Sequence, residues 1–304
     1  MNSIKKRRNA ILLALLAAIF YAINIPVSKL LLNRVDPIFM SAFLYLGAGI
    51  GIGMLSLCAG KRTDQVGGRL TRAELPYTIG MIILDIAAPI LLMFGLRTAS
   101  AANVSLLNNF EIVATTLIAL FVFKEVVSKK LWLAIALITM ASMLLSFDDI
   151  SGLHFSIGSL FVLGACICWG FENNCTRMMS SKNTYQIVTL KGIFSGLGSL
   201  IIALISNEHL PKLGSILFTL LLGFISYGLS IFLYVRAQNE LGAAKTSAYY
   251  AVSPFIGTLL SCLFFKESIG SIFFIALAIM ICGTLLVVSD TMAAAPACNA
   301  ESSK

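Results

Sequence analysis

Two acidic residues lie in the middle of long apolar runs, where no water would solvate a carboxylate. Asp85 falls within the run 76–96 and Glu111 within the run 101–123. An ionised group at the centre of a bilayer costs about 2.5–3.5 kcal/mol on insertion scales, so such residues are candidates for functional sites. Reversible protonation (ion coupling) or contact with a charged substrate would be their chemistry. A structural ion pair or a hydrogen bond to a broken helix is the alternative.

Further polar and aromatic side chains fall inside the apolar runs near these acids. Aromatic rings would give a solute contact area, and amide groups would orient it. Helical spacing prevents all of these side chains from facing inward, and about half should face lipid or other helices. The residues that we predict as the lining of a substrate cavity are Tyr21, Asn108, Asn109, Trp169, Glu172, Tyr249 and Tyr250.

Three basic residues also fall inside apolar runs. Lys29 and Arg177 occupy equivalent places near the ends of their runs, where long side chains can extend to the membrane interface. The alternative for both is gating or contact with an anionic group. Lys191 lies within two turns of the start of its run, and we expect its ammonium to reach the interface in the same way.

The composition excludes a soluble domain. Of the 304 residues, 58% are hydrophobic and 12% charged, against about half and a quarter in soluble domains. The seven cysteines are odd in number and mostly lie in apolar runs, so we interpret them as small core residues. The two histidines stand alone, and no nucleotide-binding loop is present. We therefore expect no metal, no cofactor and no ATPase activity.

Apolar runs of about 20 residues are long enough to cross a bilayer. The predicted fold is all-α, a polytopic membrane protein with ten spans. Fifteen Lys and Arg would face the cytoplasm and four the outside if both termini are cytoplasmic, which is the orientation we predict. The first run is too long for a signal peptide. The spans are 9–32, 38–59, 76–96, 101–123, 130–147, 156–176, 185–206, 213–235, 244–265 and 270–289.

The chain contains an internal repeat. A shift of 142 residues aligns 99–145 with 241–287 without a gap, and a shift of 148 places Lys29 on Arg177. Each copy has five spans, and because five is odd the second copy would enter the membrane from the opposite side. We predict two inverted repeats, 9–147 and 156–289, and a short cytoplasmic tail, 290–304. Inverted repeats are typical of secondary transporters.

Small residues and prolines mark where helices should pack closely or break. Gly47, Gly49, Gly51 and Gly53 form two overlapping GxxxG patterns, which favour close helix packing within or between monomers. Prolines inside spans remove backbone hydrogen bonds, and such breaks occur at transporter sites as well as at packing kinks. They are Pro26, Pro89 and Pro254.

Several segments resemble the drug/metabolite transporter superfamily, specifically its EamA-type members. They are Ala165-Cys166-Ile167-Cys168-Trp169-Gly170, Tyr227 to Ser230, Leu241 to Ala248, Ser253-Pro254-Phe255 and Phe265-Lys266-Glu267. The first repeat departs from the pattern, since Glu111 stands where the second has Ser253 and Ile112 where it has Pro254. The resemblance implies a ten-helix transporter with a central cavity.

We therefore predict a secondary transporter, not an enzyme, that moves a small organic metabolite such as an amino acid across the plasma (inner) membrane. Export is expected, with proton coupling or facilitated diffusion both open. The alternatives are an uptake carrier or exchanger for nucleoside- or sugar-type metabolites and, more remotely, a membrane-embedded enzyme. The expected partners are the substrate, protons and lipid, with no nucleic acid, and the protein would be a monomer or homodimer.

Overall fold

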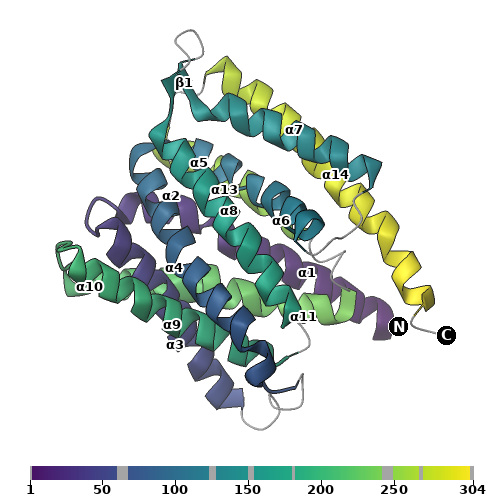
Figure 1. Ribbon diagram of the computed structural model, residues 1–304, viewed down its shortest axis with the longest axis horizontal. Coiled ribbons are helices and arrows are strands. Elements are labelled where there is room, and N and C mark those ends of the chain that lie inside the picture. Colours follow the sequence, from purple (N-terminus) through teal and green to yellow (C-terminus); the bar gives the residue numbers. More distant parts are fainter. Residues whose placement is uncertain are drawn as a thin grey trace.

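The computed structural model describes residues 2–59, 68–122, 128–149, 154–179, 182–241, 249–266 and 270–301. In these ranges the chain forms a bundle of helices, joined at one point by a short β-hairpin (Figure 1). The part of the predicted ninth span at 244–248 lies outside the described residues.

The elements follow the predicted apolar runs closely. The final helix continues beyond the predicted last span, into the segment that we assigned to the tail. In chain order the elements are α1 (Asn2–Ala22), α2 (Asn24–Leu31), α3 (Pro37–Ala59), η2 (Arg72–Glu74), α4 (Leu75–Thr98), α5 (Ala101–Leu107), α6 (Phe110–Phe121), α7 (Lys129–Ser146), β1 (Phe147–Asp149), β2 (His154–Phe155), α8 (Ile157–Met178), α9 (Thr184–Ile205), α10 (Leu213–Gly223), η3 (Phe224–Leu229), α11 (Ser230–Leu241), α13 (Ser253–Phe265) and α14 (Ser271–Glu301).

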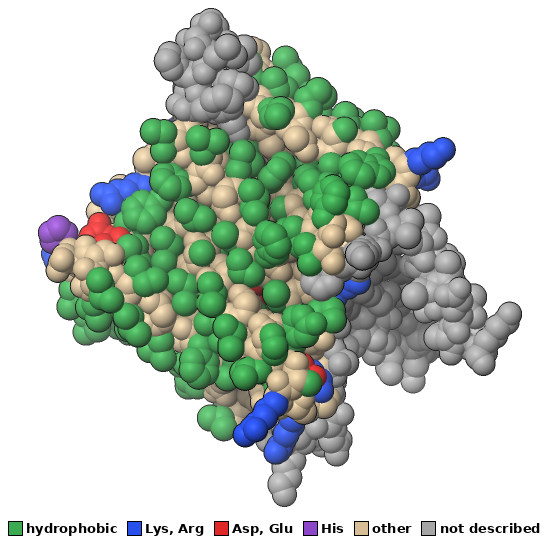
Figure 2. Space-filling view, in the orientation of Figure 1, with side chains coloured by type: hydrophobic (Ala, Val, Ile, Leu, Met, Phe, Trp, Pro, Cys, Tyr) green, Lys and Arg blue, Asp and Glu red, His purple; other side chains and the backbone are tan. Residues whose placement is uncertain are grey.

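The surface of the bundle is suited to lipid. Large apolar side chains such as Leu57, Ile205 and Leu213 point outward. Figure 2 shows hydrophobic side chains over most of one face, with charged ones near its margins. Seven helical segments of the described chain are long and apolar enough to cross a membrane: Arg8–Leu31, Pro37–Cys58, Arg72–Thr98, Ala101–Phe121, Thr184–Ile205, Leu213–Tyr234 and Ser271–Asp290. The chain is thus a multi-pass, membrane-embedded helical protein.

The helices pair mainly between the two halves of the chain. α3 packs against α9, α4 against α8, and α7 against α14. α1 packs against α11, and α5 against α13. α8 also contacts α6, so it lies between α4 and α6.

Glycines on two faces of α3 permit its close packing. A Cβ on Gly49 would lie 2.6 Å from the backbone nitrogen of Ile193 on α9, and one on Gly192 would lie 2.4 Å from the Cα of Gly49. On the other face, a Cβ on Gly47 would lie 2.0 Å from the carbonyl oxygen of Leu220 on α10. The predicted close packing is confirmed at Gly47, Gly49 and Gly51 within one molecule, but not at Gly53, where a Cβ would lie 3.4 Å from the nearest atom.

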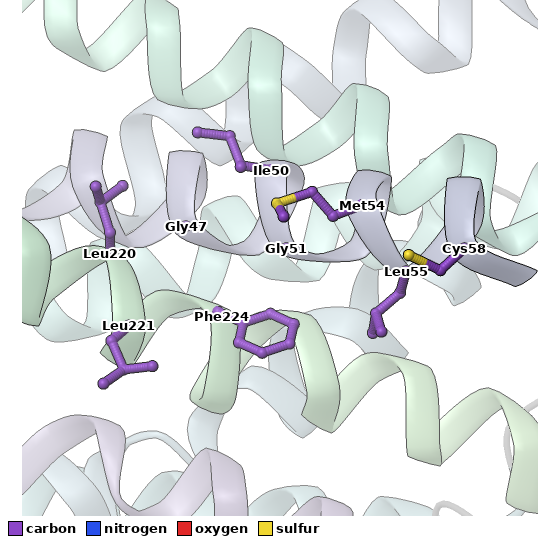
Figure 3. Close-up of a pocket in the computed structure, with 9 residues that line it drawn as sticks. All are labelled: Gly47, Ile50, Gly51, Met54, Leu55, Cys58, Leu220, Leu221 and Phe224. Atoms are coloured by element: carbon purple, nitrogen blue, oxygen red, sulfur yellow. The ribbon is translucent and has the colours of Figure 1, made fainter.

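An apolar groove of about 390 Å³ runs between α3 and α10–η3 (Figure 3). The ring of Phe224 faces α3 at Gly51, where a Cβ would meet it at 2.0 Å. The groove lies within two candidate spans and is lined by carbon and sulfur side chains, so it suits acyl chains rather than a polar solute. Its lining is Gly47, Ile50, Gly51, Met54, Leu55, Cys58, Leu220, Leu221 and Phe224.

Four predicted spans are interrupted, and in the ninth a turn at Ala251 and Val252 comes directly before α13. The first divides into α1 and α2 at Ile23, shortly before Pro26, which has no N–H for the carbonyl of Ala22. The fourth divides into α5 and α6 at Asn108 and Asn109. The eighth contains a π-helical turn, η3, a feature that occurs frequently at functional sites.

Not every proline breaks its helix. α4 continues through Pro89, although that residue has no N–H for the carbonyl of Asp85. Pro254 lies in the first turn of α13, where the missing N–H is tolerated. Among the three prolines, the expectation of an interruption within a span therefore fails at Pro89.

Polar contacts join the connecting segments at one end of the bundle. Asp36, which precedes α3, lies 3.7 Å from Arg97 and 3.5 Å from His209. Asn207 has a φ of 54°, and this left-handed turn brings Glu208 to the start of α3. The Glu208 carboxylate accepts hydrogen bonds from the backbone nitrogens of Ile38 at 3.0 Å and Phe39 at 2.9 Å.

Replacing Glu208 with alanine should destabilise the protein by about 1 kcal/mol, because the first N–H groups of α3 would lose a carboxylate acceptor. Thermal unfolding of the purified protein in detergent would measure it. The control is His209→Ala, because the His209 side chain is almost fully exposed, at 99%. Equal melting temperatures of Glu208→Ala and wild type would contradict this role.

A second set of polar contacts joins the segments that come before α4 and α9. Lys182 lies 3.2 Å from Glu74, and the backbone nitrogen of Asn183 donates to the carbonyl of Gly68 at 2.9 Å. These contacts connect the segment before α4 to the segment before α9.

Candidate substrate and ion site

A buried ion cluster joins α4, α8 and α9. Asp85 on α4 is fully buried, and its carboxylate lies 3.1 Å from the Lys191 ammonium of α9. The same ammonium lies 2.9 Å from the carboxylate of Glu172 on α8, which is also buried. Two acids from different helices therefore share one ammonium.

The expectation that Lys191 reaches the membrane interface was wrong. Its side chain is only 14% exposed and points to the two acids. The physical reason is charge compensation, because two buried carboxylates attract the nearest ammonium more strongly than the interface does. Glu172 also accepts a hydrogen bond from Thr176, one turn further along α8.

Aromatic side chains lie beside this ion cluster. The Tyr45 hydroxyl donates to the Asp85 carboxylate at 2.8 Å, and the indole nitrogen of Trp169 lies 3.5 Å from the Tyr45 oxygen. The rings of Tyr45 and Tyr227 are 5.2 Å apart between centroids. Tyr227 lies in η3, so the π-helical turn contributes directly to the site.

The aromatic contacts continue toward α1 and the start of α13. Tyr21 lies 5.9 Å from Tyr227 and 5.8 Å from Tyr250, measured between ring centroids. The amide of Asn24, at the start of α2, lies 3.3 Å from the Tyr227 hydroxyl. The predicted residues Tyr21, Trp169 and Tyr250 thus belong to one continuous group of rings with Tyr45 and Tyr227.

Glu111 has a separate hydrogen-bonded setting. It lies in the first turn of α6, and its carboxylate accepts a hydrogen bond from the Asn173 amide of α8 at 2.7 Å. The same amide lies 3.2 Å from the Thr115 hydroxyl. Among the described residues, the group that binds the Glu111 carboxylate is therefore an amide and not a cation.

A short stretch of α8, residues 169–173, contacts three neighbouring helices. Trp169 reaches α3, Glu172 reaches α9, and Asn173 reaches α6. Gly170 allows this closeness, because a Cβ there would lie 2.8 Å from the Cβ of Ala114 on α6. Glu111 therefore contacts this stretch of α8 directly, whereas Asp85 is linked to it through Lys191.

The remaining predicted lining residues have other contacts. Asn108 and Asn109 are buried at the break between α5 and α6, and the Asn109 amide donates to the carbonyl of Leu106 in its own helix. The Cys166 thiol lies 4.0 Å from the Asn108 side-chain oxygen. Tyr249 is half-buried next to Tyr250.

The two basic residues at equivalent places differ in exposure. The Lys29 ammonium donates to the carbonyls of Leu96 at 2.5 Å and Ala99 at 2.8 Å, where it caps the end of α4. Arg177 is exposed in the last turn of α8. Lys29 thus holds two helix ends together, a contact suited to a gate as well as to structural support.

Sequence reasoning missed four participants in the site. Tyr45 and Tyr227 are aromatic residues in apolar runs, and Asn24 and Asn173 are amides whose partners lie far along the chain. Two of them carried a signal: Tyr227 stands at the repeat position equivalent to Asp85, and Asn173 belongs to the unusually polar run Glu172-Asn173-Asn174. The six cysteines with described side chains are free thiols, but Cys58 and Cys282 are exposed, so the interpretation of the cysteines as core residues is wrong for these two.

Comparison with known proteins agrees with this architecture. The model of the EamA-like transporter family matches residues 8–147 and again residues 156–289. The chain belongs to the EamA-like transporter family. It is thereby a transporter of the drug/metabolite superfamily, as the sequence motifs predicted.

Relatives of this EamA-like transporter carry transporter names without a stated substrate. An uncharacterized transporter of Methanothermobacter thermautotrophicus is 25% identical, over 89% of this chain and 83% of that protein. The uncharacterized transporter YyaM of Bacillus subtilis is 23% identical, over 84% of this chain and 86% of that protein. A solved crystal structure, described only as that of a protein, has a TM-score of 0.67 at 15% identity and covers 92% of this chain and 96% of that one. It shows similarity of fold alone.

Proposed function

We propose that this EamA-like transporter exports a small organic metabolite, an amino acid or a similar amine, across the inner membrane in exchange for protons. The observation that carries the proposal is the meeting of buried carboxylates and aromatic rings around one turn of α8. Carboxylates there can bind a substrate cation or a proton, and the rings of Tyr45 and Tyr227 give contact to its apolar part.

The proposed architecture is ten membrane spans in two inverted repeats. The helix pairing supports it, because the pairing is preserved when the repeats are exchanged. Exchange of the two repeats turns the contact of α4 with α8 into the contact of α11 with α1, and both contacts are present. Three further contacts each join a span to its equivalent in the other repeat: α3 with α9, α7 with α14, and α5 with α13. A two-fold arrangement of this kind suits two halves that rock about a central site.

Orientation follows from the distribution of basic residues. We propose that both termini face the cytoplasm, since this places fifteen Lys and Arg inside and four outside. The contact of Lys182 with Glu74 would then lie at the cytoplasmic end, and the contacts of Asp36 at the outer end.

Glu111 is the better placed of the two acids for proton coupling. Asp85 shares the Lys191 ammonium with Glu172. Protonation of Asp85 would therefore break its ion pair with Lys191. Glu111 accepts from the neutral amide of Asn173 and can gain a proton without releasing a cation. We assign proton coupling to Glu111 and substrate contact to Asp85.

Replacing Glu111 with glutamine should abolish acceleration of transport by a pH gradient, because the side chain could no longer exchange a proton. The measurement is flux of a panel of labelled amino acids, amines, nucleosides and sugars in proteoliposomes, with and without a pH gradient. Glu74→Gln, at the end of the bundle, is the matched control. Gradient-driven flux that survives in Glu111→Gln would exclude the assignment, and movement of nucleosides or sugars alone would favour the exchanger instead.

A further inference from the structure

We infer that the Lys191 ammonium occupies the place of the substrate's own ammonium group, and that Lys191 competes with the substrate for Asp85 and Glu172. The inference rests on the proposed transport function and names its substrate class. That class is a primary amine with an apolar body. Lys191 is then a residue that sets affinity and specificity.

The first argument is the set of ligands around Lys191. Its ammonium lies 3.1 Å from the carboxylate of Asp85 and 2.9 Å from that of Glu172. These acids come from α4 and α8, while Lys191 comes from α9. Two carboxylates converging on one ammonium form a binding site for that group, whether a side chain or a solute supplies it.

The second argument is the balance of charge. When all three side chains are ionised, two carboxylates face one ammonium, and a single negative charge remains buried. Buried uncompensated negative charge is costly, so the cluster favours a cation over an anion as its occupant. A substrate carboxylate could approach Lys191 only by displacing one of its two acids.

The third argument is the aromatic wall beside the acids. Tyr45 connects the acids to the aromatic rings, because its hydroxyl binds Asp85 at 2.8 Å and its ring lies 5.2 Å from the ring of Tyr227. Trp169 adds an indole whose nitrogen is 3.5 Å from the Tyr45 oxygen. Aromatic faces attract organic cations and also cover apolar groups. An amine with an apolar or aromatic body fits both features.

Lys191 also has a route by which it can leave. It lies two turns from the start of α9, roughly 10 Å along the helix axis, and its four-carbon stem is flexible. Its side chain is already 14% exposed. Withdrawal toward that helix end would free both acids, so a substrate ammonium enters as the Lys191 ammonium leaves, with no change in the charge of the cluster.

Binding of a simple amine tests the inference without any transport assay. The chain has two tryptophans, and Trp132 on α7 is 45% exposed. In a Trp132→Phe background, fluorescence of Trp169 reports ligand beside the acids. The probes are phenethylamine, its uncharged analogue 2-phenylethanol and the anion 3-phenylpropionate, each titrated into purified protein in detergent.

Replacing Lys191 with methionine should tighten phenethylamine binding by about tenfold or more, a factor that corresponds to about 1.4 kcal/mol. The neutral and anionic probes should not gain affinity. Lys182→Met, which removes an ammonium bound to Glu74 away from the site, should behave as wild type. Unchanged or weaker phenethylamine binding in Lys191→Met would overturn the inference.

Lys191→Arg tests the competition between Lys191 and the amine if Lys191→Met does not fold. The guanidinium binds two carboxylates through several donors and retains its charge, so it should resist displacement and weaken phenethylamine binding. Equal affinity in wild type and Lys191→Arg would then overturn the inference. A protein that binds amines as expected yet moves no solute in proteoliposomes would contradict the proposed function and leave the amine site established.

Discussion

Leucine at position 192 is expected to prevent stable folding. Gly192 lies on α9 where that helix crosses α3, and even a Cβ would lie 2.4 Å from the backbone of Gly49. Backbone atoms cannot rotate away as a side chain can, so the two helices would have to separate. We expect destabilisation of at least about 3 kcal/mol, at the upper end of the range for overpacked cores.

Thermal unfolding and size-exclusion chromatography of detergent-purified protein would measure this effect. Gly214→Leu is the matched control, because no atom lies within 4 Å of a Cβ at that glycine of α10. The control should elute and melt as wild type does. A monodisperse Gly192→Leu protein with a wild-type melting temperature would show that the crossing of α3 and α9 is wrongly placed.

The second large effect concerns the balance of charge among Asp85, Glu172 and Lys191. Lys191→Met leaves the carboxylates of Asp85 and Glu172 buried without a cation, and removal of one partner from a buried pair costs about 3–5 kcal/mol. Asp85→Asn leaves the Lys191–Glu172 pair intact at 2.9 Å and neutralises the excess charge. We therefore expect Lys191→Met to be far more destabilising than Asp85→Asn.

The double variant Asp85→Asn/Lys191→Met completes a thermodynamic cycle. It retains one carboxylate and no ammonium, so it should recover part of the stability lost in Lys191→Met. Melting temperatures of the four proteins at one neutral pH give the coupling energy. Simple addition of the two single effects would show that Asp85 and Lys191 do not interact. If the amine site exists, phenethylamine should raise the melting temperature of Lys191→Met more than that of wild type.

Most of the helical architecture could be predicted because hydrophobic length is a strong local signal. The helices α3, α9 and α10 to α11 follow predicted spans within a few residues. The site was harder, because it depends on the rotation of each helix. Glu172 and Asn173 are neighbours in sequence but contact α9 and α6 respectively, and local sequence does not determine which neighbour lies on which side.

Lys191 illustrates the limit most clearly. From its position alone, extension of the side chain to the interface was the sensible expectation. The decisive partners are Asp85 and Glu172, which lie on other helices, so the outcome depends on tertiary packing. Asn108 and Asn109 are a milder case, since two adjacent amides in an apolar run could have indicated the break between α5 and α6.

The glycines of α3 also bear on how this protein can assemble. GxxxG patterns in membrane helices are often taken as dimer interfaces. Here Gly47 and Gly51 pack against α10 and η3, while Gly49 packs against α9 in the same molecule. A helix of a second copy could not pack against the backbone at Gly47 or Gly49 without displacing one of those helices, although Gly47 and Gly51 also line the apolar groove beside α10 and η3. Exposed apolar side chains such as Leu57 or Ile205, and not these glycines, would therefore form the surface of a homodimer.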